Sequence, residues 1–177
     1  MYMRERKETN VKKILNFLGE TFELLPAPFE TPHSYLKRVN KAPYKYYRDS
    51  VRSMKKRGLV KIFEKNGEKF IQLTYKGQLE SLLYSLRSRT KERWDGKWRM
   101  VIFDIPESSR GRRGMIRRLL KREGFVRLQN SVYISPFKLN AQSIDYLKKS
   151  YLIHYLRILR VDAMDDDKDL KNRFKLN

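Results

Sequence analysis

A predicted helix from Pro43 to Arg57, within the cationic segment 37–61, carries the side chains best suited to binding a polyanion. Helical projection at 100° per residue turns one face of this segment away from its apolar side chains. That face holds Lys45, Tyr46, Asp49, Arg52, Ser53 and Lys56. Cations contact phosphates, whereas hydroxyl groups, a carboxylate and arginine also hydrogen bond to base edges in a major groove. Two interpretations are open: a nucleic-acid recognition helix, or a solvated helix face.

Further cations flank this face in the sequence, and we predict that they contact backbone phosphates. They are Lys37, Arg48, Lys55, Lys65 and Lys69. The last two lie on either side of Asn66-Gly67, which is the strongest short signal for a β-hairpin. This places positive charge at the tip of a predicted hairpin.

A second basic segment, residues 108–122, contains seven cations and no acid. Projection of a helix places Arg117 and Lys121 outward, with Arg110 and Arg113 nearby. Cations in the first turns of a helix oppose its dipole by about 0.3–1 kcal/mol each, so helix stability does not explain them. The segment is predicted either as a second phosphate-binding surface or as a surface for an acidic partner subunit.

Few residues of this chain could form a metal site or a nucleophilic catalytic site. The chain has no cysteine and two histidines, which excludes disulfides, thiolate zinc sites and thiol nucleophiles. His154 falls in a predicted apolar strand, residues 153–161, where we expect a core side chain. The acidic residues between 162 and 169 lack the glycine and final glutamate of a calcium loop, so we predict a solvated segment or one that pairs with a basic partner surface.

The composition describes a folded and strongly basic protein. The 177 residues carry 41 Lys and Arg against 20 Asp and Glu, a net charge of +21, while 40% are hydrophobic and 12% aromatic. This is enough apolar material for packed cores. No apolar run is long enough to span a membrane, and no signal-peptide pattern follows the first charges. We therefore expect a cytoplasmic protein without a membrane partner.

The first half predicts a winged helix-turn-helix domain over residues 1–90. An apolar face that includes Ile14 and Leu15 indicates a helix ending at Pro26, and Thr31-Pro32 begins a short second helix. The third helix has Pro43 in its first turn and runs to Arg57, with Gly58 as its stop, and strands on either side of Asn66-Gly67 form the wing. Its predicted core face consists of Tyr44, Tyr47, Val51 and Met54. Thr74 then begins a leucine-rich helix, and Leu73-Thr74-Tyr75-Lys76-Gly77 resembles the strand-to-helix exit of bacterial winged-helix regulators.

The second half predicts a different domain over residues 94–165. A strand near 97–105, the basic helix, two strands within 125–135, a helix near 141–150 and the strand 153–161 give the order β-α-β-β-α-β, which is ferredoxin-like. Residues 166–177 are predicted as a polar tail. The fold class is thus α+β, with a winged helix-turn-helix followed by a ferredoxin-like domain.

Motifs in this half resemble a known family. They are Trp98-Arg99-Met100-Val101-Ile102-Phe103-Asp104-Ile105-Pro106, the arginine-rich helix, Gly124-Phe125 and Leu128-Gln129-Asn130-Ser131-Val132-Tyr133-Ile134-Ser135-Pro136. Together they resemble the central domain of PaaX-type transcriptional repressors, which is similar to the ferredoxin-fold endonuclease of CRISPR adaptation. The resemblance implies a sequence-specific regulator, a repressor, that binds double-stranded DNA as a homodimer through the second domain. No cofactor is expected for this function.

The same resemblance carries one enzymatic alternative, at Asp104. In the nuclease family an aspartate at the end of the first strand, one from each subunit, holds a divalent metal for phosphodiester hydrolysis. Magnesium or manganese suits paired carboxylates. The other interpretation of Asp104 is a strand-end carboxylate that accepts hydrogen bonds from loop amides, and on balance we predict a regulator rather than an enzyme.

Overall fold

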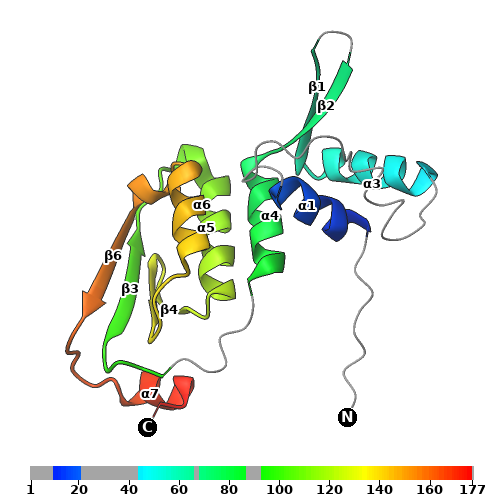
Figure 1. Ribbon diagram of the computed structural model, residues 1–177. Helices are drawn as coiled ribbons and strands as arrows, with labels where there is room; N and C mark the ends of the chain where they lie inside the picture. Colours follow the sequence, from blue (N-terminus) through cyan, green and yellow to red (C-terminus); the bar gives the residue numbers. More distant parts are fainter. Residues whose placement is uncertain (1–9, 21–43, 66–67, 87–92, 177) are drawn as a thin grey trace, which may run out of the picture. The chain divides into compact units, whose positions relative to one another are not determined.

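The computed structural model describes residues 10–20, 44–65, 68–86 and 93–176. The chain divides into two compact units, Met1–Ser85 and Leu86–Asn177, and both combine helices with antiparallel strands (Figure 1). Within the described residues, no helix is both long enough and apolar enough to cross a lipid bilayer.

The first unit contains three helices and a hairpin in the described residues. These are α1 (Asn10–Glu20), α3 (Tyr44–Lys56), β1 (Val60–Lys65), β2 (Glu68–Leu73) and α4 (Tyr75–Ser85). The strands pair in the antiparallel register Val60↔Leu73 to Lys65↔Glu68, as the Asn66-Gly67 signal predicts. The predicted second helix, which begins at Thr31, lies outside the described residues, so the helix-turn-helix pair stays a prediction.

The core of this unit is built from the predicted apolar faces. Ile14 and Leu15 of α1 are fully buried against Met54 of α3, together with Leu59, Val60 and Leu73. The end of α3 explains how the helix and the hairpin join. Gly58 has φ of +69°, its N–H bonds to Lys55 O at 2.9 Å, and Leu59 N–H bonds to Met54 O at 2.9 Å. This is a Schellman motif with its usual apolar contact, here between two buried side chains.

The segment 73–77 locks α4 to that turn. The Thr74 hydroxyl accepts from Gly77 N at 3.1 Å, which caps α4, and donates to Gly58 O at 2.7 Å. A Cβ on Gly77 would lie 2.0 Å from Leu59 O. Only glycine fits this position, because the backbone of α4 approaches the turn after α3 so closely.

The second unit contains the predicted order β-α-β-β-α-β. Its elements are β3 (Trp98–Phe103), η1 (Glu107–Ser109), α5 (Arg110–Arg122), β4 (Val126–Gln129), β5 (Val132–Ser135), α6 (Ala141–Lys149), η2 (Leu152–Tyr155), β6 (Leu156–Val161) and α7 (Lys168–Phe174). The strands form one sheet in the order β4-β5-β3-β6, and every neighbouring pair is antiparallel.

The two faces of this sheet differ. Helices α5 and α6 lie side by side on one face (Figure 1), where Val101, Phe103 and Tyr133 are buried. The opposite face carries Met100 and Ile102, because side chains alternate along a strand. One end of that opposite face is covered by α7.

The covering helix α7 replaces the predicted polar tail. Leu170 of α7 is 4% exposed and joins Trp98 and Ile134 in an apolar cluster. The Phe174 ring lies 5.8 Å from the Trp98 ring, and Trp98 Nε1 donates to Asp167 Oδ2 at 3.0 Å. Two apolar side chains four residues apart, Leu170 and Phe174, give this polar segment one face that packs.

Candidate nucleic-acid interface

Helix α3 presents its polar face to solvent and its apolar face to the core. Val51 and Met54 are 9% and 0% exposed, and Tyr47 is partly buried against the same core. The core face predicted for this helix is therefore confirmed for these three residues, while the side chain of Tyr44 lies outside the described residues. The packing of Val51 and Met54 fixes which side of the helix can meet a ligand.

The polar face has the predicted members wherever it is described. Exposed side chains are those of Tyr46, Arg48, Asp49, Arg52, Ser53, Lys55 and Lys56. The exposed fraction of Tyr46 is 56%, which is large for an aromatic residue. Lys55 and Lys56 also lie in the last turn, where cations favour the helix dipole. Their positive charge therefore has a local structural role beside any role in binding.

Four more predicted contacts fall where side chains are not described. Lys37 lies outside the described residues, as does the side chain of Lys45. Lys65 and Lys69 have described backbone positions at the end of the hairpin, opposite Glu68 and Glu64 respectively in the register. The hairpin end therefore mixes both signs of charge, rather than being purely cationic.

The second basic surface is smaller than predicted. Arg110 and Lys121 are exposed, as expected. Arg113 instead turns back to its own unit, donating to Ile105 O at 2.8 Å and pairing with Glu107 Oε2 at 3.4 Å. Arg117 is partly buried, and its Nη2 donates to Asn130 O at 3.4 Å. Periodicity cannot find such partners because they are loop carbonyls brought close by the tertiary fold.

Another arginine of α5 is also engaged inside the unit. Arg112 Nη1 donates to the Tyr155 hydroxyl at 3.1 Å, and its guanidinium lies 5.8 Å from the centre of that ring. Arg122 Nη2 donates to Leu86 O at 2.7 Å. Several cations of α5 thus hold loops of the second unit, which is a local explanation for their number that the sequence did not reveal.

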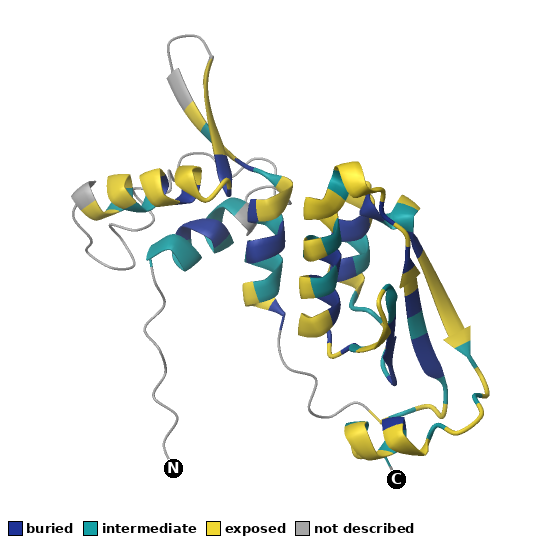
Figure 2. Ribbon diagram, turned by 180° about the vertical axis from the view of Figure 1, so that it is seen from behind, coloured by how far each residue is buried: buried dark blue, intermediate teal, exposed yellow. Residues whose placement is uncertain are grey.

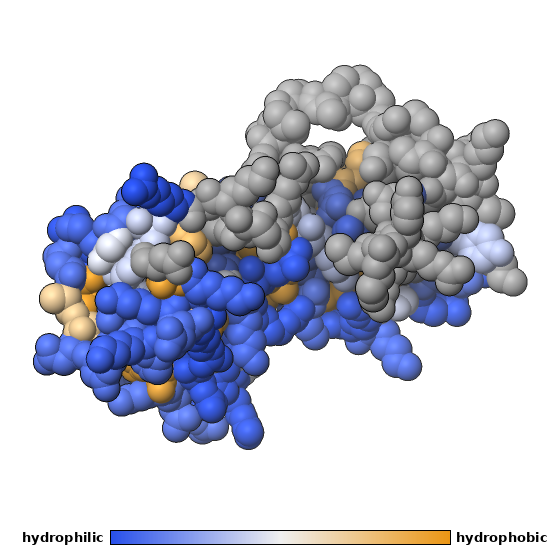
Figure 3. All heavy atoms as spheres, turned by 90° about the horizontal axis from the view of Figure 1, so that it is seen from below, coloured by the Kyte–Doolittle hydropathy of each residue, from blue (hydrophilic) through white to orange (hydrophobic). Residues whose placement is uncertain are grey.

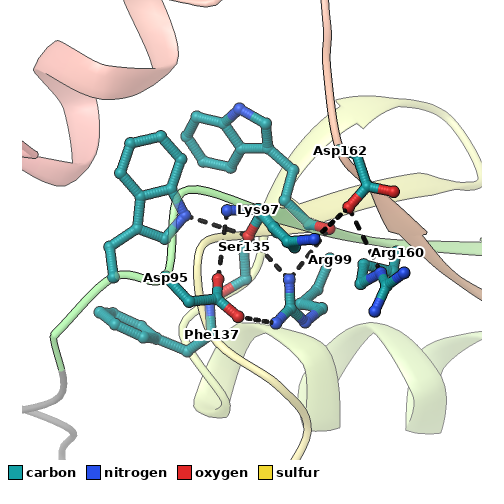
Figure 4. Close-up of polar contacts among 9 residues, drawn as sticks. Asp95, Lys97, Arg99, Ser135, Phe137, Arg160 and Asp162 are labelled. Carbon is teal, nitrogen blue, oxygen red and sulfur yellow. Dashed lines mark hydrogen bonds and ion pairs between the residues drawn. The ribbon is translucent and has the colours of Figure 1, made fainter.

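A cluster of ion pairs surrounds the start of β3 (Figure 4). Arg99, only 6% exposed, donates to Lys97 O at 2.8 Å and pairs with Asp95. The hydrogen bond from Arg99 lowers the pKa of Asp95 below its ordinary value. Lys97 and Arg160 both pair with Asp162, at 2.8 and 3.4 Å, and the Lys97 hydrogen bond lowers the pKa of Asp162. These cations are neutralised within the unit.

The acidic stretch 162–169 is thus partly structural. Asp162 pairs with Lys97, while Asp167 accepts from Trp98 and pairs with Lys171 at 2.8 Å. Asp165, Asp166 and Asp169 are exposed. Two of these acids therefore find their partners inside their own unit, a possibility the sequence analysis did not include.

Asp104 lies directly after β3, with its backbone N–H bonded to Tyr155 O at 3.0 Å. The side chain is exposed, and its carboxylate has no hydrogen bond or ion pair with any other described residue. The predicted bonds to loop amides are therefore not seen. Across the described ranges, no three His, Cys, Asp or Glu side chains gather as a metal-binding group.

The expectation for His154 is wrong. The residue lies in η2 rather than in a strand, since β6 begins only at Leu156. Its side chain is exposed, with its ring 6.3 Å from the Tyr151 ring in a stacked arrangement. The apolar neighbours in the sequence mimic a strand because Leu152 and Leu156 are buried on either side of the turn.

On the one face that Figure 3 shows, the described residues are predominantly hydrophilic. Figure 3 shows hydrophilic side chains over most of the described part of one face, with hydrophobic atoms in smaller areas between them. The exposed cations not tied to a described acid include Arg48, Arg52 and Lys56 of α3. These side chains give α3 an exposed, positively charged surface.

Comparison with known families shows which domain the second unit is similar to. Residues 91–172 match the family model of the PaaX protein central Cas2-like domain. None of the curated proteins searched matches this chain. The matched region runs from before β3 into α7, and so includes the whole sheet together with the first part of the helix that covers its end. The second unit is thus similar to the PaaX central domain, and this match supports a PaaX-type family assignment.

Proposed function

We propose that the protein is a sequence-specific DNA-binding regulator of transcription, a repressor, that acts as a homodimer. The observation that carries this proposal is the exposed face of α3, where Tyr46, Asp49, Arg52 and Ser53 surround cations on a helix fixed by its buried side. The match of the second unit to the PaaX central domain supports a role in transcription.

In this proposal the first unit is a winged helix-turn-helix and α3 is its recognition helix. Arg52 is placed to donate two hydrogen bonds to guanine in the major groove, and Asp49 to accept from cytosine. Arg48 and Lys55, on the flanks, contact phosphates and set the register without reading sequence. The hairpin β1–β2 then lies against the DNA backbone as the wing.

The second unit, with a ferredoxin-like fold, supplies the dimer contact. We define the open strip as the apolar residues Ile102, Val132 and Leu159, which lie on the sheet face opposite α5 and α6. The exposed Arg157, opposite Ile102 in the register, borders this strip on β6. Ile102 and Leu159 are 37% and 41% exposed. An apolar strip of this kind suits the same strip on a second copy, because a two-fold contact is self-complementary.

Selection of bound duplexes from a random-sequence pool tests the regulator. A sequence-specific dimer enriches a motif with two-fold symmetry, whose half-sites are about one or more helical turns apart. Enrichment of no motif would overturn the proposal.

Arg52→Ala is expected to weaken the binding free energy by about 1–3 kcal/mol on the enriched duplex and by less on duplexes of mixed sequence. Arg110→Ala, a cation of the other unit, is the matched control and keeps the enriched motif.

A second candidate function rests on the exposed, unpaired carboxylate of Asp104. Two copies of Asp104 across a two-fold axis would provide the paired oxygens that magnesium or manganese prefers, and such an ion supplies charge neutralisation for phosphodiester hydrolysis. Incubation of the pure protein with DNA or RNA, with and without each metal, tests this activity. Metal-dependent cleavage that Asp104→Asn abolishes would establish a nuclease.

A further inference from the structure

Two phenylalanines face solvent in the middle of the hairpin. Phe63 of β1 and Phe70 of β2 are directly opposite in the register, and their rings stack with centroids 5.5 Å apart and planes 18° apart. They are 45% and 40% exposed. Within the described residues, neither ring has an aromatic or cationic partner beyond this pair.

Side chains alternate between the two faces of the hairpin, and this makes the position of the phenylalanine pair unusual. Val60 and Leu73 are buried at 3% and 8% exposure, and their face continues outward through Ile62 and Ile71. Phe63 and Phe70 therefore lie on the other face, where a half-buried hairpin normally carries polar residues. Figure 2 shows that the strands are exposed along most of their described length. The stacked pair is thus an apolar surface without a role in the core.

The charges around the pair favour a polyanion as its partner. Lys61 lies on the same face, two residues before Phe63, and is exposed. Lys56 and Arg57, which precede the hairpin, are also exposed. At the far end of the same face Glu68 lies opposite Lys65, while the exposed acid Glu64 belongs to the opposite face. The cations on and before this face therefore outnumber its one acid. Apolar rings beside cations match a nucleic acid, whose sugars and base faces lie between phosphates.

We propose that Phe63 and Phe70 form a wedge that presses into the minor groove and unstacks a base step. This inference rests on the proposed DNA-binding function, in which α3 occupies the major groove. Apolar side chains that enter a base step kink the duplex. The protein would then bend its site and favour flexible pyrimidine–purine steps at positions that no polar side chain contacts.

The test compares DNA affinity with DNA bending on the duplex that the wild-type protein enriches from the random pool. In the double variant Phe63→Thr/Phe70→Thr, threonine keeps the preference for strands. We expect the variant to bind about tenfold or more weakly, with an unchanged slope of log affinity against log salt, because no phosphate contact is removed. Energy transfer between dyes on the two duplex ends should report a straighter complex.

Lys61→Gln is the matched control on the same face. It should reduce the salt slope and leave the bend unchanged, since it removes a cation and keeps the rings. A second double variant, Phe63→Leu/Phe70→Leu, keeps an apolar surface and should retain most of the bend. If the double threonine variant fails to fold by circular dichroism, the single variants Phe63→Thr and Phe70→Thr take its place, and each should weaken binding and reduce the bend.

Two outcomes overturn the wedge. A folded threonine variant that binds and bends the enriched duplex like the wild type shows that the rings do not touch DNA. Variants that lose self-association while a mixed-sequence duplex still binds normally show that the pair is a protein contact. In either case the motif that the wild-type protein enriches is unaffected. Such a result would contradict the wedge but not the proposed DNA-binding regulator. Absence of any enriched motif instead contradicts the regulator itself.

Discussion

Arginines that look alike in the sequence of α5 do different things in the folded chain. Arg110 is exposed, whereas Arg113 donates to the carbonyl of Ile105, a residue only 2% exposed, and pairs with Glu107. The hydrogen bond to a buried carbonyl matters more than the exposed ion pair, which adds little in water.

We therefore expect Arg113→Ala to lower the free energy of unfolding of the second unit by about 1 kcal/mol. Arg110→Ala should change it by less than about 0.5 kcal/mol. Urea unfolding followed by tryptophan fluorescence measures both, because both tryptophans of the chain, Trp94 and Trp98, belong to this unit. Equal effects of the two substitutions would show that the Ile105 contact contributes nothing.

Gly77 is the position where one added methyl group is expected to cost most. Because a Cβ would lie 2.0 Å from Leu59 O, Gly77→Ala must push α4 away from the turn after α3. The expected loss is about 1–3 kcal/mol in the first unit, measured by thermal unfolding in circular dichroism. Gly111→Ala on α5 is the control, since nothing lies within 4 Å of its added Cβ, and it should not destabilise the protein.

Among the elements, α3 was predictable and α7 was not. The apolar spacing of Tyr47, Val51 and Met54 indicates a helix and its buried face without knowledge of the rest of the chain. By contrast, α7 has only Leu170 and Phe174 as apolar anchors, and what they pack on is Trp98, about seventy residues earlier. The wedge residues were missed for a related reason: Phe63 and Phe70 read as ordinary strand residues until the register shows which face they share.

The docking of α7 is expected to depend on pH. Hydrogen bonds from Lys171 and then from Trp98 lower the pKa of Asp167 below its ordinary value of 3.8. A lowered pKa in the folded state adds stability that is complete above the unfolded value and is lost as pH falls through the folded one. Acidification below about 3.8 should therefore loosen α7 and change the fluorescence of Trp98.

Asp167→Asn provides the control for this titration. The amide oxygen can still accept from Trp98 but does not titrate in this range, so the acid-dependent fluorescence change should become smaller. A titration identical to that of the wild type would assign the change to other carboxylates, such as Asp162.

At the scale of the whole molecule, the proposed dimer has a sharp test because neighbouring residues of β6 point in opposite directions. Leu159 lies in the open strip, while Ile158, with a nearly equal exposed fraction of 42%, lies on the face toward α5 and α6. Leu159→Arg is expected to give a monomer by sedimentation equilibrium, because charge in an apolar two-fold contact meets its own copy. Ile158→Arg should leave the dimer intact. Dimers that persist with Leu159→Arg would exclude the open strip.

In the proposed dimer, helix α7 also limits how many copies can assemble through the open strip. It covers the end of the sheet face around Trp98 and Ile134 and leaves the end with Ile102 uncovered. A fully open face would allow a second copy to slide along it and a third to add to the remainder, which is how open-ended chains of subunits grow. With one end already filled by its own chain, each copy has a single short contact to offer. The C-terminal helix therefore acts as a stop that favours a closed pair over a polymer.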